Sequence, residues 1–201
     1  QAVPAAWPMM RAHAPVLATL GVATSLVATI RACRQVVIPL WASHIGLDAA
    51  TTSLIYGLMG AVDMLLFYPA GRVMDQRGRR AVALPSMLIM GASFCLMPLT
   101  SGFASLLAVS LLMGVGNGMG AGIVLTIGAD ASPVAGRTQF LGLWRVITDM
   151  GGGGGPLLLS LLTALITLAG GVVVTGGLGL TAAWMFWRWL PRGAAAVARA
   201  S

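Results

Sequence analysis

Five charged residues interrupt long apolar stretches, and their chemistry needs an explanation: Arg31, Arg34, Asp63, Arg145 and Asp149. At roughly 3 kcal/mol each, they would together cost about 15 kcal/mol in hydrocarbon, which is comparable to the whole stability of a typical domain. We therefore expect them to face a water-filled cavity or one another. Ionisable groups in such a place can bind a polar substrate or carry a proton, although ion pairs that merely lock a helix bundle remain a structural alternative.

The composition indicates that these residues lie in a membrane protein. The chain has 201 residues, of which 58% are hydrophobic and 8% charged, and its mean hydropathy is +0.90. A transmembrane helix needs about 20 mainly apolar residues. Six stretches meet that need: 15–41, 50–70, 81–100, 103–127, 139–166 and 170–190. Because the connections are short, we expect one all-α membrane domain of six transmembrane helices over residues 1–201.

Composition also excludes several function classes. The net charge of +7 comes from arginines scattered at the ends of apolar runs, without the basic face of a nucleic-acid-binding protein. The two cysteines, Cys33 and Cys95, lie inside apolar runs, where free cysteine behaves as a small hydrophobic residue. With no histidine cluster and no nucleophile constellation, the sequence predicts no metal site, no cofactor and no enzyme activity.

Arginine outside the apolar stretches is confined to alternate segments. The other connections, at 43–49, 101–102 and 167–169, contain none. Since loops kept in the cytoplasm carry the excess of positive residues, we expect both termini to be cytoplasmic, in the plasma (inner) membrane. The arginines that support this orientation are Arg11, Arg72, Arg77, Arg79, Arg80, Arg137, Arg188, Arg192 and Arg199.

Depth in the membrane suggests partners for the five charges. Arg31 and Arg34 share one helical face with Gln35. Counted at about 1.5 Å per residue from the cytoplasmic ends of the stretches, Arg31 lies roughly 25 Å deep, Asp63 and Arg145 about 10 Å, and Asp149 about 15 Å. The depths predict that Asp63 pairs with Arg145. They also allow Asp149 to join them in one proton-coupled site, and the alternative is a permanent pair of Asp63 and Arg145 with Asp149 only capping the cavity.

Small residues recur in two stretches. In the fourth, glycines occupy every second position from 114 to 122 around Asn117, which predicts a helix with two small-residue faces. We include Asn117 among the candidate cavity residues. In the second, Gly57 and Gly60 predict close packing against a neighbouring helix.

A polar loop over residues 71–80 carries the pattern Gly-x-x-x-Asp-x-x-Gly-Arg-Arg, formed by Gly71, Asp75, Gly78, Arg79 and Arg80. It resembles the signature that joins the second and third helices in each half of major facilitator superfamily transporters. Gln76 and Ala81 stand where that signature usually has basic residues.

Two further patterns resemble the same family. Residues 130–137 fit the Asp-x-x-Pro-x-x-x-Arg loop that is common before the fifth or eleventh helix. Gly142, Gly151, Gly155 and Pro156 fit the Gly-x8-Gly-x3-Gly-Pro pattern associated with antiporters, without its closing Gly-Gly.

The resemblance implies half of a transporter, built of two inverted three-helix repeats, whose first, second, fourth and fifth helices line a cavity. It also implies that the loop carrying Asp75 latches the cytoplasmic side and that the glycine-proline helix bends or slides. The arginine that the family's first half carries in its fourth helix is absent, which favours the C-terminal half. The partners implied are a small-molecule substrate, protons, the lipid bilayer and the other half of the transporter.

The function expected is proton-coupled efflux of a small molecule. An importer of sugars or organic anions attracted by Arg31 and Arg34 remains open, as does a membrane scaffold or partner subunit without transport activity. A scaffold has no need for five charges inside the membrane, and that feature separates the two classes.

Overall fold

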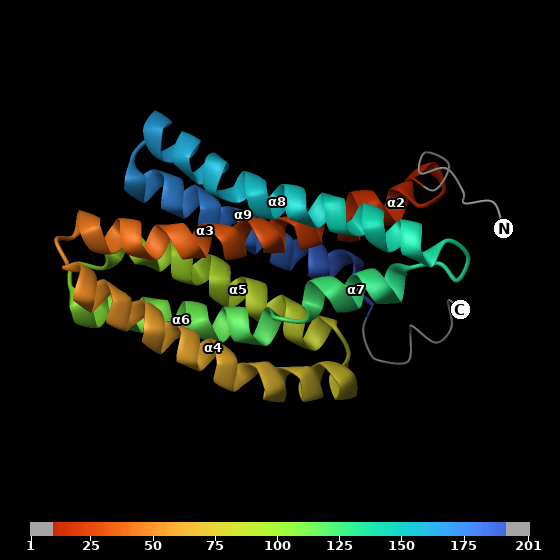
Figure 1. Ribbon diagram of the computed structural model, residues 1–201, viewed down its shortest axis with the longest axis horizontal. Helices are drawn as coiled ribbons and strands as arrows, with labels where there is room; N and C mark the ends of the chain where they lie inside the picture. Colours follow the sequence, from red (N-terminus) through yellow and green to blue (C-terminus); the bar gives the residue numbers. More distant parts are fainter. Residues whose placement is uncertain (1–9, 192–201) are drawn as a thin grey trace.

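The computed structural model describes residues 10–191, which are almost entirely helical and contain no strand (Figure 1). The expectation of an all-α protein is thereby confirmed for this part of the chain. In chain order the elements are α2 (Ala14–Val16), the π-helical turn η1 (Leu17–Gly21), α3 (Val22–His44), α4 (Ala49–Arg77), α5 (Arg80–Leu96), the 3-10 turn η2 (Met97–Leu99), α6 (Phe103–Gly120), α7 (Ile123–Ala131), α8 (Arg137–Leu165) and α9 (Leu168–Trp189).

Five segments are long and apolar enough to cross a membrane: Ala14–His44, Ala49–Arg77, Arg80–Leu99, Phe103–Ala131 and Leu168–Trp189. They overlap five of the six predicted stretches, and the second segment extends seven residues beyond the predicted end at residue 70. The remaining stretch forms α8, which has 29 residues and packs along α3 and α9. Its five consecutive glycines and its charged residues lower its hydropathy, so its role as the sixth span stays a prediction.

The helix pairs follow the symmetry of two inverted three-helix repeats. Helix α3 packs on α8, and α4 packs on α6, so the first helix of each repeat contacts the second helix of the other. The third helices of the two repeats, α5 and α9, pack on each other. Exchanging the repeats leaves this set of contacts unchanged, and all six long helices run along one common direction (Figure 1).

The glycines of α6 form two packing faces, as the alternate spacing predicts. A side chain at Gly114 would come within 2.6 Å of the Met59 carbonyl oxygen on α4, and Gly118 faces the same helix. Gly116 and Gly120 face α5, where a side chain at Gly116 would come within 2.9 Å of Met90 Cγ. Residues four apart share a helical face, so alternate glycines divide between two neighbours.

The packing expected at Gly57 and Gly60 is wrong. A methyl group added at either position would meet no described atom within 4 Å. Helix α6 already supplies the small residues that let it approach α4, and the two α4 glycines are turned away from that contact.

Helix α8 approaches α3 through two glycines of the Gly-Pro pattern. A side chain at Gly155 would come within 2.8 Å of the Thr29 carbonyl oxygen, and the Thr29 hydroxyl donates a hydrogen bond of 3.1 Å to the Gly151 carbonyl. Gly142 makes no such approach. The close packing predicted for this helix is therefore found at Gly151 and Gly155.

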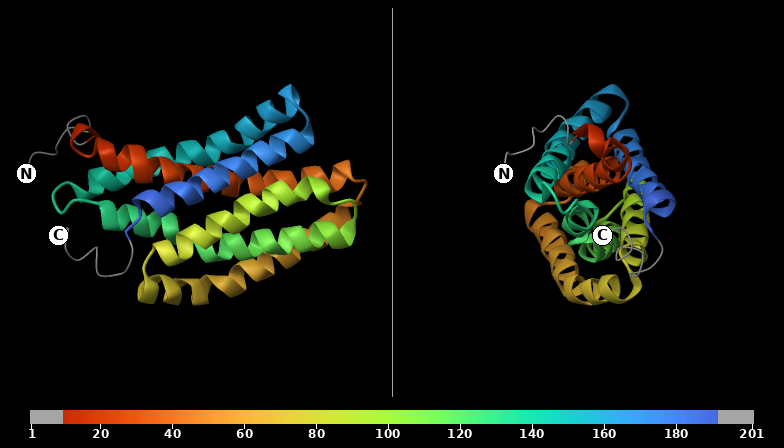
Figure 2. Two further views of the ribbon diagram at one scale, coloured as in Figure 1. Left: turned by 180° about the vertical axis from the view of Figure 1, so that it is seen from behind. Right: turned by 90° about the vertical axis from the view of Figure 1, so that its right-hand side faces the viewer.

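The connections alternate between the two ends of the bundle. The turn between α4 and α5, the start of α8 and the end of α9 lie at one end, and the turns at 45–48, 100–102 and 166–167 lie at the other (Figures 1 and 2). The first end, here called the arginine-rich end, carries arginines in or next to the helix termini, namely Arg72, Arg77, Arg79, Arg80 and Arg137. Arg192 and Arg199 fall outside the described residues.

Candidate functional site

An ion pair inside the bundle joins the first two long helices. Arg34 Nη2 on α3 lies 3.3 Å from Asp63 Oδ2 on α4, and the two side chains are only 10% and 20% exposed. The Asn117 side chain on α6 donates a hydrogen bond to the same carboxylate oxygen. Asp63 therefore links three helices, and its charge is held by one cation and one amide.

The second arginine of α3 contacts backbone oxygens of the fourth membrane-spanning segment. Arg31 Nη2 donates to the Asn117 carbonyl at 3.0 Å, and Arg31 Nη1 donates to the Ala121 carbonyl at 3.5 Å. Its charge is attracted by Asp63 and repelled by Arg34. Among the described residues, only Arg34 forms an ion pair with Asp63, so the second arginine leaves the cluster with one excess positive charge.

Several polar atoms of this cluster have no hydrogen-bond partner among the described residues. They are Arg31 Nε, Arg34 Nε and Asn117 Oδ1, and all three are buried. A partly satisfied polar cluster in a low-dielectric interior is costly. Such a cluster is a poor way to stabilise a fold and a suitable place to bind a polar ligand or a proton.

The predicted pairing of Asp63 with Arg145 is wrong. Helix α4 continues to Arg77, so Asp63 lies 14 residues, or about 21 Å, from that end. Arg145 lies only eight residues, or about 12 Å, from the start of α8. The two groups are at different depths, and Arg34 takes the place expected for Arg145.

Arg145 instead pairs with Asp149 one turn along α8, at 2.9 Å. Their side chains are 69% and 61% exposed, so this pair lies on an open face of the helix. The single coupled site expected from Asp63, Arg145 and Asp149 is therefore divided into a buried pair and an exposed pair.

Gln35 lies beside the buried cluster. It is exposed on α3 and lines an open groove of about 390 Å³ with Thr52, Ser53 and Tyr56 of α4. Four of the seven predicted cavity residues, namely Arg31, Arg34, Asp63 and Asn117, are thus joined in one network, with Gln35 on the neighbouring surface.

The loop motif closes the arginine-rich end of the bundle. Gly78 has a φ of 88°, a conformation that favours glycine, and it ends α4. The following Arg79 contacts two carboxylates: its Nε lies 2.9 Å from Asp130 at the end of α7, and its Nη1 lies 3.3 Å from Asp75. The pKa of Arg79 is raised, chiefly by the hydrogen bond to Asp130, while partial burial opposes the shift.

Sequence reasoning included Asp130 in a loop pattern but not among the site residues. The structure places Asp130 in the last turn of α7, where a carboxylate is unfavourable for the helix dipole and benefits from a nearby cation. The sequence carries no signal for this, because the apolar stretch ends at residue 127 and Asp130 is expected in a loop. Arg80, also in the motif, lies over the Trp187 ring at 5.8 Å.

We predict that Asp130→Asn loosens the arginine-rich end more than Asp75→Asn does. The Asp130 side chain is 24% exposed and that of Asp75 is 76% exposed, so solvent weakens the second pair more. Faster amide exchange at residues 72–80 in the Asp130 variant should report the change. Arg77→Gln is the control and should leave the exchange rate unchanged, because Arg77 is exposed and makes no ion pair with any described residue. Equal amide exchange rates in the two aspartate variants would contradict the prediction.

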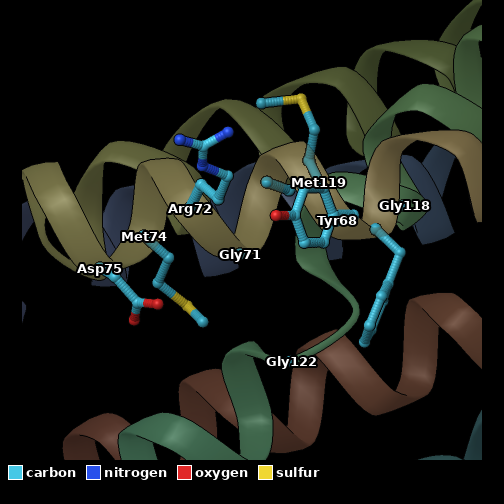
Figure 3. Close-up of a pocket in the computed structure, with 10 residues that line it drawn as sticks. Tyr68, Gly71, Arg72, Met74, Asp75, Gly118, Met119 and Gly122 are labelled. Carbon is cyan, nitrogen blue, oxygen red and sulfur yellow. The ribbon is translucent and has the colours of Figure 1, made fainter.

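A small groove lies beside this loop, between α4 and the junction of α6 and α7. It has a volume of about 230 Å³, and its lining includes Tyr68, Gly71, Arg72 and Asp75 on α4 and Gly122 at the junction (Figure 3). The groove places Gly71 of the loop motif next to the point where the fourth membrane-spanning segment is interrupted.

Comparison with protein families supports the sequence resemblance. The family model described as Major Facilitator Superfamily matches residues 20–201. A search of the curated proteins gave no match.

Proposed function

Because the chain belongs to the major facilitator superfamily, whose members carry small molecules across membranes, we propose that it takes part in proton-coupled efflux, with Asp63 as the proton acceptor. Members of this family are transporters and not enzymes. The points to establish for this chain are therefore the direction of transport and the ion gradient that drives it. The observation that carries the proposal is the buried ion pair of Arg34 and Asp63, held by Asn117.

A proton on Asp63 would change several contacts at once. It would remove the negative charge that faces Arg34 and weaken the hydrogen bond accepted from Asn117. These contacts join α3, α4 and α6, so the charge state of one carboxylate affects how three helices are held together. Coupling of a proton to transport requires such a link between protonation and helix packing.

Infrared difference spectroscopy on the reconstituted full-length protein tests the proton site without knowledge of the substrate. A pH titration should give a protonated-carboxyl band that is lost in Asp63→Asn. The control is Asp149→Asn, since Asp149 belongs to the exposed pair. If the band persists unchanged in Asp63→Asn, then Asp63 has only a structural role.

Transport of organic anions is the second candidate function. Arg34 is neutralised by Asp63, whereas the hydrogen bonds of Arg31 to described residues go to backbone carbonyl groups, and an anionic substrate would neutralise this excess positive charge. A flux driven by an anion gradient that survives in Asp63→Asn but fails in Arg31→Gln would favour this function over proton-coupled efflux. A scaffold without transport activity would show no flux driven by an anion gradient and none driven by a proton gradient.

We further propose that the arginine-rich end is cytoplasmic. The support is that Arg72 and Arg77 in the last turns of α4 and Arg137 at the start of α8 all lie at that end. A cysteine introduced at Ser101 should react with an impermeant maleimide from outside the cell, and one at Gln76 only after the cytoplasmic side is opened. Reversed labelling would overturn the orientation.

A second six-helix unit is proposed to cover α4 and α8. Helix α4 exposes Met64 and Leu65 at 80% and 75%, and α8 exposes Met150 at 71% beside the Arg145–Asp149 pair. Lipid would solvate the apolar residues but not the charged pair. In the same labelling experiment, a cysteine at position 149 should react with maleimide because an aqueous cavity reaches it. The unfolded variant, in which every cysteine is accessible, is the positive control. If the cysteine reacts after unfolding but not in the folded protein, this face of α8 is not accessible to water.

A further inference from the structure

The fourth membrane-spanning segment, Phe103–Ala131, is interrupted after α6, which forms its first 18 of 29 residues. Helix α6 ends at Gly120 and α7 begins at Ile123, and α7 leaves the junction at an angle to α6 (Figure 1). The two residues between them, Ala121 and Gly122, are a turn. The last carbonyl groups of a helix lack partners within the helix, so an interruption inside a membrane needs other donors.

Arg31 supplies those donors from α3. Its guanidinium group spans the end of α6 and contacts the carbonyl oxygens of Asn117 and Ala121. A cation at the C-terminal end of a helix also interacts favourably with the helix dipole. Unlike Arg34 and Arg145, Arg31 makes no ion pair with a described carboxylate, and its hydrogen bonds go to the interrupted backbone.

The interruption has room to move on its other side. Gly118, Met119 and Gly122 form one wall of the 230 Å³ groove, and α4 forms the opposite wall (Figure 3). A methyl group at Gly122 would approach Met74 Cε no closer than 3.6 Å, which is ordinary contact. The junction is therefore held on one side by hydrogen bonds from Arg31 and borders the groove on the other side.

We propose that Arg31 is a positioning residue that holds a hinge at residues 121–122. Asn117 connects this hinge to the buried ion pair, because its carbonyl accepts from Arg31 while its side chain donates to Asp63. A change at Asp63 therefore reaches the hinge through one residue. The inference deepens the proposed transport function by naming the element that moves, but the hinge itself is tested without transport.

Electron paramagnetic resonance distance measurements on the full-length protein in lipid nanodiscs provide the test. Spin labels at Ala104→Cys on α6 and Leu125→Cys on α7 flank the hinge, and both positions are exposed. Cys33 and Cys95 are replaced by alanine. Arg31→Gln should broaden the distance distribution at least twofold, and Arg31→Lys, which keeps a cationic donor, should restore part of the narrow distribution.

Arg145→Gln is the matched control, since it removes a membrane arginine that lies away from the hinge. Equal distributions for the wild type and Arg31→Gln, or the same broadening in Arg145→Gln, would overturn the proposal. If Arg31→Gln does not fold, Gly122→Ala replaces it: loss of glycine freedom should narrow the distribution, and an unchanged width would reject the hinge. Failure of Asp63 as the proton site would leave these distance results unaffected.

Discussion

Gly151→Leu should prevent α8 from packing on α3 and should destabilise the six-helix unit by about 3 kcal/mol or more. A side chain at position 151 would collide with the carbonyl group of Ser25, which belongs to the α3 backbone and cannot rotate away. The same change would disturb the hydrogen bond from Thr29 to the Gly151 carbonyl. The yield of monodisperse protein and its thermal unfolding temperature are the measurements.

Gly153→Leu is the matched control for this prediction. Gly153 lies in the same run of five glycines, two residues further along α8, but a side chain there would meet no described atom within 4 Å. Leucine has a higher helix propensity than glycine, so this variant should be as stable as the wild type or slightly more stable. Similar losses in both variants would mean that the glycine run itself, and not close packing at Gly151, is what the helix needs.

The packing role of the glycines could be predicted in part from their spacing. Alternate glycines in α6 fall on two helical faces whatever the neighbours are, and the structure places Gly114 and Gly116 against different helices. The same rule failed at Gly57 and Gly60, because spacing shows which residues share a face but not which face meets a neighbour. That choice depends on the rotation of the whole helix in the bundle.

The partner of Asp63 could not be predicted because the helix end was misplaced. Apolar sequence ends near residue 70, but the backbone continues as α4 to Arg77. Those seven residues add about 10 Å, or two helical turns, to the depth of Asp63. Polar residues can extend a helix beyond the hydrocarbon, so hydropathy locates the apolar segment without locating the end of the helix.

The buried cluster shows what sequence reasoning could and could not provide. Arg31, Arg34, Asp63 and Asn117 were identifiable one by one, since a polar residue in an apolar stretch must find a polar partner. Their grouping depends on α3, α4 and α6 meeting at one level. Arg34 lies ten residues, or about 15 Å, before the end of α3, and Asp63 lies 14 residues, or about 21 Å, after the start of α4. The long arginine side chain bridges this difference in level, and the hydropathy of the stretches does not show that.

Arg34→Met should destabilise the protein by about 3–5 kcal/mol, because it leaves the Asp63 carboxylate in the interior without its cation. Arg145→Met should cost no more than about 1 kcal/mol, because its pair with Asp149 is exposed. Reversible unfolding of the full-length protein in mixed detergent micelles would measure both. Equal losses would mean that burial does not separate the two pairs.

The double variant Arg34→Met with Asp63→Leu decides what the buried pair is for. Replacing both charges by apolar side chains removes the desolvation cost together with the attraction, so most of the stability lost in Arg34→Met should return. Gradient-driven transport should nevertheless stay absent, since no carboxylate remains at this position to take a proton. A double variant that is stable but does not transport would show that the ion pair serves proton coupling and does not stabilise the fold. A double variant that stays as unstable as Arg34→Met would mean that the ion pair is needed to hold α3 and α4 together.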